Sequence, residues 1–286
     1  MKCQFIQKFK PIFSILRMCQ VLEVKRNSYY AWSSRGKSPR TREDELLLTR
    51  IKNIFEDNDR NYGSPRIQKE LEKQGIHHGQ KRIARLMKEN QLKAKIFKKF
   101  RICSKPVDNE EASPNLVNRV FKVNKPNKVW VTDITYIWTR SGWLYLCVFL
   151  DLYSRKVVGW SVSRNMKAEL VLDAYRKAIN FARPDKGLII HSDRGSQYGS
   201  YVYRNALREN EFLQSMSRRG NCWDNACMES FFHSLKIELI YHITIDGIES
   251  LKWSLFNYID VFYNRKRLHS FLNYSSPVDF EKMKVA

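Results

Sequence analysis

Residues 129–137, Val-Trp-Val-Thr-Asp-Ile-Thr-Tyr-Ile, decide the fold prediction, because they combine a strand-forming pattern with a single acid, Asp133. The β-branched and aromatic side chains of this stretch favour a β-strand. An unpaired carboxylate inside an apolar strand is costly to bury unless a partner or a metal ion neutralises it. The stretch therefore predicts a core strand that carries a candidate functional acid.

More strands and helices are expected after this stretch. Residues 143–152 are almost continuously apolar, which is typical of a strand covered on both faces of its sheet. Further strands are expected at 156–163, 187–191 and 212–216, and helices at 169–182, 201–210, 224–239 and about 250–263. This order predicts an α/β domain over residues 129–286.

The sequence before residue 129 predicts three other segments: a helical lead over 1–42, a small all-helical domain over 43–92 and a basic linker over 93–128. In the helical domain, Ser64 is expected to cap a helix that has Pro65 at its first position and ends near Gly75. A second helix is expected over about 80–90. The linker has few apolar side chains that could anchor it to a core.

The second of these helices has a basic face, because Lys81, Arg85 and Lys88 recur at helical spacing. Two short helices with a Gly-containing turn, the second one basic, suggest a helix-turn-helix that contacts DNA. The alternative is a plain helical hairpin whose basic face is solvated. The local pattern leaves both interpretations open.

The chain as a whole is strongly basic, with 51 Lys and Arg against 29 Asp and Glu and a net charge of +22. A surplus of this size attracts polyanions, and a nucleic acid is the favoured partner. No apolar run approaches the roughly 20 residues of a membrane helix. The 6 cysteines form no CxxC pair and no structural zinc set. We therefore expect a soluble, cytoplasmic, DNA-binding chain with reduced thiols and no membrane partner.

Two acids besides Asp133 stand at positions where sites form. Asp193 directly follows the buried strand at 187–191, and α/β sheets bind ligands at the carboxyl ends of their strands. Glu229 lies near the start of the helix at 224–239. Three carboxylates suit Mg²⁺ or Mn²⁺, and together with a substrate phosphate they can clamp two ions.

Each of these acids also has a purely structural explanation. Asp133 could pair with a core arginine, and Asp193 could form a turn with Gly195. Glu229 would be favourable near a helix start through the helix dipole alone. The three acids together are harder to explain in this way than each one singly.

The sequence around the acids is more specific than their spacing of 59 and 35 intervening residues. The characteristic stretches are 191–198 (HSDRGSQY), 221–232 (NCWDNACMESFF), 62–67 (YGSPRI) and 263–270 (YNRKRLHS). Taken together in their chain order, these stretches resemble the second-frame (OrfB) product of the bacterial insertion-sequence family called IS three. That family belongs with the DDE transposases of the retroviral integrase type. The resemblance extends from about Ser28 to Phe280.

The resemblance implies an RNase H-like fold, in which a five-stranded mixed sheet is flanked by helices. Asp133 on the first strand, Asp193 after the fourth and Glu229 on a facing helix would be the catalytic and metal-binding residues. The implied activity is metal-dependent cleavage of DNA followed by strand transfer, in which a 3′-hydroxyl attacks another strand. The implied partners are double-stranded DNA at the element ends and target, further copies of the chain on DNA in the nucleoid, and the first-frame (OrfA) product.

Lys236 follows Glu229 by seven residues, almost two helical turns, so the two side chains are expected to point the same way. The family that the chain resembles has a basic residue here that is thought to hold DNA near the active site. His233 shares this face, and its alternative is a half-buried polar residue.

The residues around the start of the same helix are given structural roles. Asp224 and Asn225 are expected to cap the helix, and Phe231 and Phe232 are expected to enter the core. Trp223 either stacks on a base or packs inside the protein, and packing is favoured.

Two other functions remain open from the sequence. One is a nuclease of the RNase H superfamily that hydrolyses DNA without strand transfer. The other is a non-catalytic DNA-binding protein that uses only its basic N-terminal half. A strand-transfer assay with pre-cut ends separates the first from a transposase, and metal-independent binding without any cleavage would favour the second.

Overall fold

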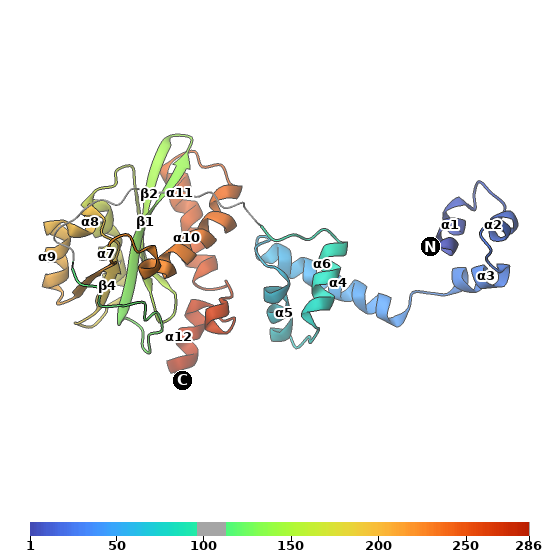
Figure 1. The fold of residues 1–286 in the computed structure, drawn as a ribbon, viewed down its shortest axis with the longest axis horizontal. Helices are drawn as coiled ribbons and strands as arrows, with labels where there is room; N and C mark the ends of the chain where they lie inside the picture. The colour runs from blue at the N-terminus through green and yellow to red at the C-terminus, as the bar shows by residue number, and fades with distance from the viewer. Residues whose placement is uncertain (96–112, 286) are drawn as a thin grey trace.

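The computed structural model describes residues 1–95 and 113–285, which form three parts (Figure 1). A first helical unit is followed by a second helical unit and by a sheet domain. The first unit contains α1 (Lys2–Phe9), α2 (Ile15–Val21) and α3 (Arg26–Ser34), and the second contains α4 (Pro39–Asp57), α5 (Ser64–Lys73) and α6 (Gln80–Glu89). Among the described residues, none of the helices is long and apolar enough to cross a bilayer.

The sheet domain is built around a five-stranded sheet with the strand order β3-β2-β1-β4-β5 in the described part of the chain. The strands are β1 (Val129–Thr139), β2 (Gly142–Asp151), β3 (Val157–Ser163), β4 (Ile189–Ser192) and β5 (Leu213–Met216). β2 is antiparallel to β1 and β3, whereas β4 is parallel to β1 and β5. The predicted α/β fold with a five-stranded mixed sheet is therefore confirmed.

Helices cover both faces of this sheet (Figure 1). One face carries α7 (Ala168–Ala182), α8 (Ser196–Gly199) and α9 (Tyr201–Glu209), and the other carries α10 (Ala226–Glu238) and α11 (Ile248–Phe256). Because successive side chains of a strand point to opposite faces, Trp130 packs on the α7 side and Val131 on the α10 side. A π-helix (Asn257–Tyr263), a short 3₁₀ turn (Ser270–Leu272) and α12 (Pro277–Val285) follow α11.

The second helical unit differs from the prediction at two helix starts. α4 begins at Pro39, four residues before the predicted start of the helical domain at residue 43, because Ser38 Oγ caps it by accepting the N–H of Thr41 at 3.1 Å. α5 begins at Ser64 itself, with Gly63 at the N-cap position, so the predicted Ser64 cap is wrong. Pro65 still lies in the first turn, where its missing N–H costs no helical bond.

The two larger parts are packed together, and the first unit is separate. Helices α4, α5 and α6 share one hydrophobic cluster with the α10 side of the sheet domain. The first unit has its own small core of Ile6, Met18, Cys19 and Tyr29. At the end of the predicted linker, the N–H of Leu116 donates to Ser215 Oγ at 2.9 Å and Val117 is buried. Residues 96–112 of that linker lie outside the described residues.

Candidate active site

The parallel pairing of β1 with β4 brings Asp133 and Asp193 together. The last paired residues are Val131 and His191, and each aspartate comes two residues further along the chain. Adjacent strands lie about 4.8 Å apart, so the two backbones are close at the level of the acids. Asp193 is just beyond the end of β4, and its carboxylate accepts the N–H of Gly195 at 3.0 Å. The turn offered as a structural explanation of Asp193 is therefore present as well.

Asp133 is half-buried, and within residues 1–95 and 113–285 no ion pair to a basic side chain is observed for it. Its Oδ1 accepts the N–H of Ile134 at 2.7 Å. Burial raises the pKa of Asp133 well above its ordinary value, and the neighbouring charge of Asp193 raises it further. Part of this pKa shift thus comes from repulsion between the two carboxylates, which a bound cation would offset.

Helix α10 carries Glu229 and Lys236 toward the aspartates. Both charges act on the pKa of Asp133, which Glu229 raises and Lys236 lowers. Glu229 is exposed and Lys236 is half-buried. Burial raises the pKa of Glu229 and lowers that of Lys236, and the charge of Asp133 opposes the shift of the lysine. His233, between them, is exposed.

The carboxylates do not form a finished metal cage. In the part of the chain that the structure describes, no three His, Cys, Asp or Glu side chains are close enough to hold one ion between them. Carboxylate oxygens are nevertheless the donors that hard divalent cations prefer. Asp133 and Asp193 both have raised pKa values, mainly through burial. A cation therefore fits the charge and chemistry of this pair, and Glu229 is the acid that would have to approach it.

A buried ion-pair cluster, rather than a helix cap, holds the segment before α10. Asp224 is fully buried and accepts bonds from Arg218 Nη2 and Arg119 Nε, each at 2.8 Å. The bond from the Arg218 side chain is the main reason why the pKa of Asp224 lies well below its ordinary value. Asn225 occupies the predicted N-cap position of α10, but its side chain makes no capping bond, and Asp224 lies one residue before the cap. The Asn225 amide instead donates to the carbonyl of Thr132 at 3.2 Å.

Other expectations for this segment have mixed outcomes. Phe231 and Phe232 are buried, as predicted. Trp223 is 67% exposed, so the favoured interpretation that it packs inside is wrong. The sequence reasoning missed Arg119 and Arg218. A pair such as Arg119 with Asp224 is separated by 105 positions and therefore leaves no local pattern.

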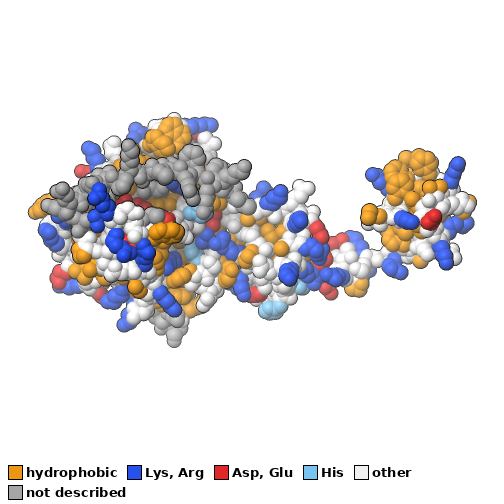
Figure 2. All heavy atoms as spheres, viewed as in Figure 1, with side chains coloured by type: hydrophobic (Ala, Val, Ile, Leu, Met, Phe, Trp, Pro, Cys, Tyr) orange, Lys and Arg blue, Asp and Glu red, His pale blue; other side chains and the backbone are white. Residues whose placement is uncertain are grey.

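Helix α6 presents two of its three candidate DNA-binding residues to solvent. Lys81 and Lys88 are exposed, and the described residues include no ion pair for either of them. Arg85 is half-buried and pairs with Asp44 of α4 at 2.7 Å and with Glu89 at 3.0 Å. Arg85 thus fastens α6 to α4. Figure 2 shows other Lys and Arg side chains on all three parts of the chain.

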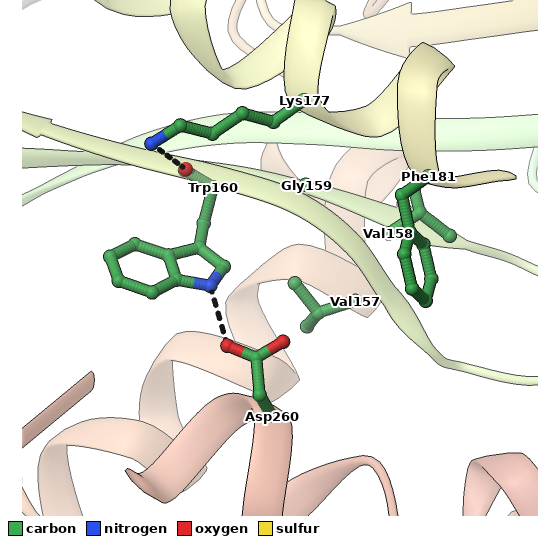
Figure 3. A pocket seen from close by; sticks show the side chains of 7 residues that line it. All are labelled: Val157, Val158, Gly159, Trp160, Lys177, Phe181 and Asp260. Carbon is green, nitrogen blue, oxygen red and sulfur yellow. Dashed lines mark hydrogen bonds between the residues drawn. The ribbon is translucent and has the colours of Figure 1, made fainter. Parts of the chain in front are cut away.

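A hollow of about 220 Å³ lies at the outer strand β3, two strands away from β1 (Figure 3). Trp160 Nε1 donates to Asp260 Oδ2 at 3.0 Å, and Lys177 Nζ donates to the Trp160 carbonyl at 3.4 Å. These bonds join β3 to the π-helix and to α7. The hollow therefore lies where β3, α7 and the π-helix pack together, and none of the three candidate acids lines it.

Family models match most of the chain. An integrase core domain matches residues 123–222, and a second integrase core model matches 229–285. An HTH-like domain matches residues 41–100. The two integrase matches together include all three candidate acids.

Similar proteins include two from bacterial insertion elements. The chain is 40% identical to the transposase InsF for insertion sequence IS3A of Escherichia coli K12 over the full length of both proteins. It is 42% identical to a protein of insertion element IS600 of Shigella sonnei, over 93% of this chain and 97% of the relative. Among solved structures, it is similar to the catalytic core of HTLV-2 integrase in complex with magnesium, at 15% identity and a TM-score of 0.41, over 55% of this chain and 97% of that one.

Proposed function

This chain belongs to the IS3 family of insertion-sequence transposases, and we propose that Asp133, Asp193 and Glu229 are the catalytic residues of its integrase core. The enzyme is a polynucleotidyl transferase that acts in DNA transposition. The observation that carries the residue assignment is the parallel β1–β4 register, because each aspartate follows the last paired residues, Val131 and His191, by two positions. The charge of Glu229 acts on the same site.

The metal cofactor that we propose is Mg²⁺ or Mn²⁺, with two ions in the working site. Asp133 and Asp193 would hold it, with Glu229 as a further ligand. When bound, such ions stabilise negative charge on the reacting phosphate and lower the pKa of the attacking hydroxyl. The ligands must be deprotonated to bind, and their raised pKa values imply that binding weakens as the pH falls.

The proposed reaction has two steps. Water first attacks a phosphodiester at an element end, and the bond to the leaving 3′-oxygen breaks. The freed 3′-hydroxyl then attacks a phosphodiester of another strand, where one P–O bond forms and one breaks, so no ATP is required. Half-buried Lys236 would bind a DNA phosphate beside the acids.

The proposed partners follow from this reaction. The HTH-like domain indicates that the chain binds DNA, and the finer proposal is that the element ends and the target are bound as duplexes by several copies of the chain. The first-frame (OrfA) product is proposed as a second protein partner, and the nucleoid of a bacterial cytoplasm as the location.

Asp133→Asn tests the assignment, because it removes a charge and keeps the shape of the side chain. Metal-dependent cleavage should fall by about a hundredfold or more, while duplex affinity should remain near that of the wild type. Asp246→Asn is the matched control, since Asp246 is exposed and pairs with Arg140 at the surface. Full cleavage by Asp133→Asn would refute the assignment.

A strand-transfer assay completes the test of the reaction. The wild-type chain is supplied with pre-cut DNA ends and a target duplex, and joined products are measured. Cleavage without any joining would identify a hydrolytic nuclease. Duplex binding with neither reaction, at any metal concentration, would identify a DNA-binding protein without catalysis.

A further inference from the structure

Two of the characteristic sequence stretches, 62–67 and 263–270, meet in the structure although the proposed reaction uses neither. The Tyr62 hydroxyl donates to the carbonyl of Lys266 at 3.2 Å and accepts the N–H of Leu268 at 2.9 Å. Arg66 Nε donates to the carbonyl of Leu268 at 2.9 Å. Side chains of the second helical unit thus bind both backbone polar groups of one buried residue of the sheet domain.

A buried carboxylate connects this contact to helix α10. Glu238, the last residue of α10, accepts bonds from Arg267 Nε at 2.8 Å, from Arg267 Nη2 at 2.6 Å and from the Tyr258 hydroxyl at 2.8 Å. Arg66 Nη1 lies 3.7 Å from the same carboxylate. The side chains of Glu238 and Arg267 are only 8% and 7% exposed. In such a place the loss of one partner leaves a buried charge uncompensated.

The chain that leaves α6 reaches the same point. Lys95 Nζ donates to the main-chain carbonyl of Glu238 at 2.9 Å. The second helical unit is therefore attached to the end of α10 through Arg66, in the first turn of α5, and through Lys95, after α6. Together with the shared hydrophobic cluster, these two polar attachments restrict rotation of the unit relative to α10.

Both elements that meet here lead to functional residues. Helix α10 has 13 residues and carries Glu229 and Lys236. Because it is short, a shift of its last turn displaces the whole helix. On the other side, α5 begins between Tyr62 and Arg66 and packs on α6, which exposes Lys81 and Lys88.

We propose that the four polar residues of this contact form a joint that fixes the orientation of α6 relative to Glu229, and so selects the phosphodiester that is cut. They are Tyr62, Arg66, Glu238 and Arg267. They are positioning residues, because they act through α5 and α10 and do not touch the reacting atoms. The inference rests on the proposed function.

Tyr62→Phe tests the joint, since it removes both hydroxyl bonds and keeps the buried ring. The probe is an end-labelled duplex from the DNA that flanks the coding frame, with Mn²⁺ present. The readouts are affinity, the footprint and the position of the cut within it. The wild type should cut at one phosphodiester. The variant should keep its affinity and footprint, spread its cuts over neighbouring phosphodiesters and cut about tenfold more slowly or worse.

Tyr175→Phe is the matched control. It removes a hydroxyl bond to the carbonyl of Ala206 at 3.0 Å, on the α7 side of the sheet. This variant should cut at the wild-type position. Arg66→Lys is a second variant of the joint, because it keeps the charge and loses the Nε donor that reaches Leu268. Circular dichroism and thermal unfolding establish that each variant is folded.

The outcomes separate the joint from the reaction it serves. The wild-type cut position and rate in folded Tyr62→Phe and Arg66→Lys proteins would overturn the joint and leave the proposed function intact. Scattered cuts in Tyr175→Phe as well would also overturn it, because the effect would then be one of general stability. No cutting of this duplex by the wild type would overturn the proposed function and the joint together.

Discussion

A single buried residue, Asp224, holds the loop that leads into helix α10. Its carboxylate accepts the backbone N–H of Arg218 at 3.0 Å in addition to the guanidinium bonds from Arg218 and Arg119. Asn115 also donates to it at 3.0 Å. With these partners the buried charge is satisfied, and the segment that contains Trp223 and leads into α10 is tied to the segment before β1.

We predict that this carboxylate makes stability depend on acid pH. Its folded pKa is lowered, so its contribution is complete above the unfolded pKa of about 4 and is lost as the pH falls toward the folded value. The free energy of unfolding, measured with urea over a pH series, should therefore fall below about pH 4. Asp224→Asn should be less stable at neutral pH and should flatten this part of the curve. Parallel curves for Asp224→Asn and Asp246→Asn would contradict the prediction.

Single residues could be predicted where the signal was local. Asp133 interrupts an apolar strand and Asp193 follows one, and in the structure each lies two residues beyond the last β1–β4 pair. Asp224 precedes a helix, so local pattern favours a cap, but its ion pairs with distant arginines decide its conformation. Glu229 could be located on its helix, whereas its distance from the aspartates depends on side-chain placement that no spacing reveals.

At the scale of elements, the packing of α7 on β3 depends on one glycine. A Cβ built on Gly159 would lie 2.5 Å from the Ala174 carbonyl oxygen and 2.6 Å from Ala178 Cβ. Both neighbours belong to α7, whose backbone cannot move aside cheaply. The helix therefore lies as close to this strand as a residue without a side chain permits.

We predict that Gly159→Ala destabilises the sheet domain by about 1–3 kcal/mol, because α7 must shift away from β3. Gly36→Ala is the matched control, since Gly36 lies outside the helices and strands and a Cβ there meets only Arg42 Nη2, at 3.6 Å. The comparison is made from denaturant midpoints at equal slope. Equal midpoints for the two variants would show that α7 accommodates the methyl group.

Elements could be predicted better than their contacts. The strands follow from period-two and continuous apolar patterns, and each observed strand lies within about two residues of its expected range. The start of α5 differs from its predicted position by one residue, because Gly63 and Ser64 are both residue types that serve as N-caps. The contact between 62–67 and 263–270 could not be predicted, since it joins segments about 200 positions apart through backbone carbonyls.

For the whole molecule, the net charge of +22 attracts DNA regardless of its sequence. The distribution of the charged side chains determines which of them contribute to DNA binding. Arg85 is already paired with Asp44 and Glu89, so part of its charge is compensated inside the protein. Lys88 lies one turn away on the same helix and is exposed. The two residues make a natural comparison.

We predict that Lys88→Ala weakens duplex binding and lowers the slope of log binding constant against log salt by about 1. Arg85→Ala should change this slope less and should lower the thermal stability more, because it removes one of the two arginine ion pairs between α6 and Asp44 of α4. Binding isotherms over a salt series and thermal unfolding of both variants provide the measurement. A larger change of slope in Arg85→Ala than in Lys88→Ala would exclude this division of roles.

The β1–β4 register also determines where residues can be inserted into the chain. The chain between Asp133 and Asp193 includes β2, β3 and α7, and it connects β1 to β4, its immediate neighbour in the sheet. Insertions in the turn between Thr139 and Gly142 leave the meeting point of the acids untouched. One residue added between Val129 and Asp133 would instead turn the carboxylate to the opposite side of the sheet. Homologous chains can therefore differ in length at this turn, whereas a change of length between Val129 and Asp133 is tolerated only if it preserves the parity of the strand.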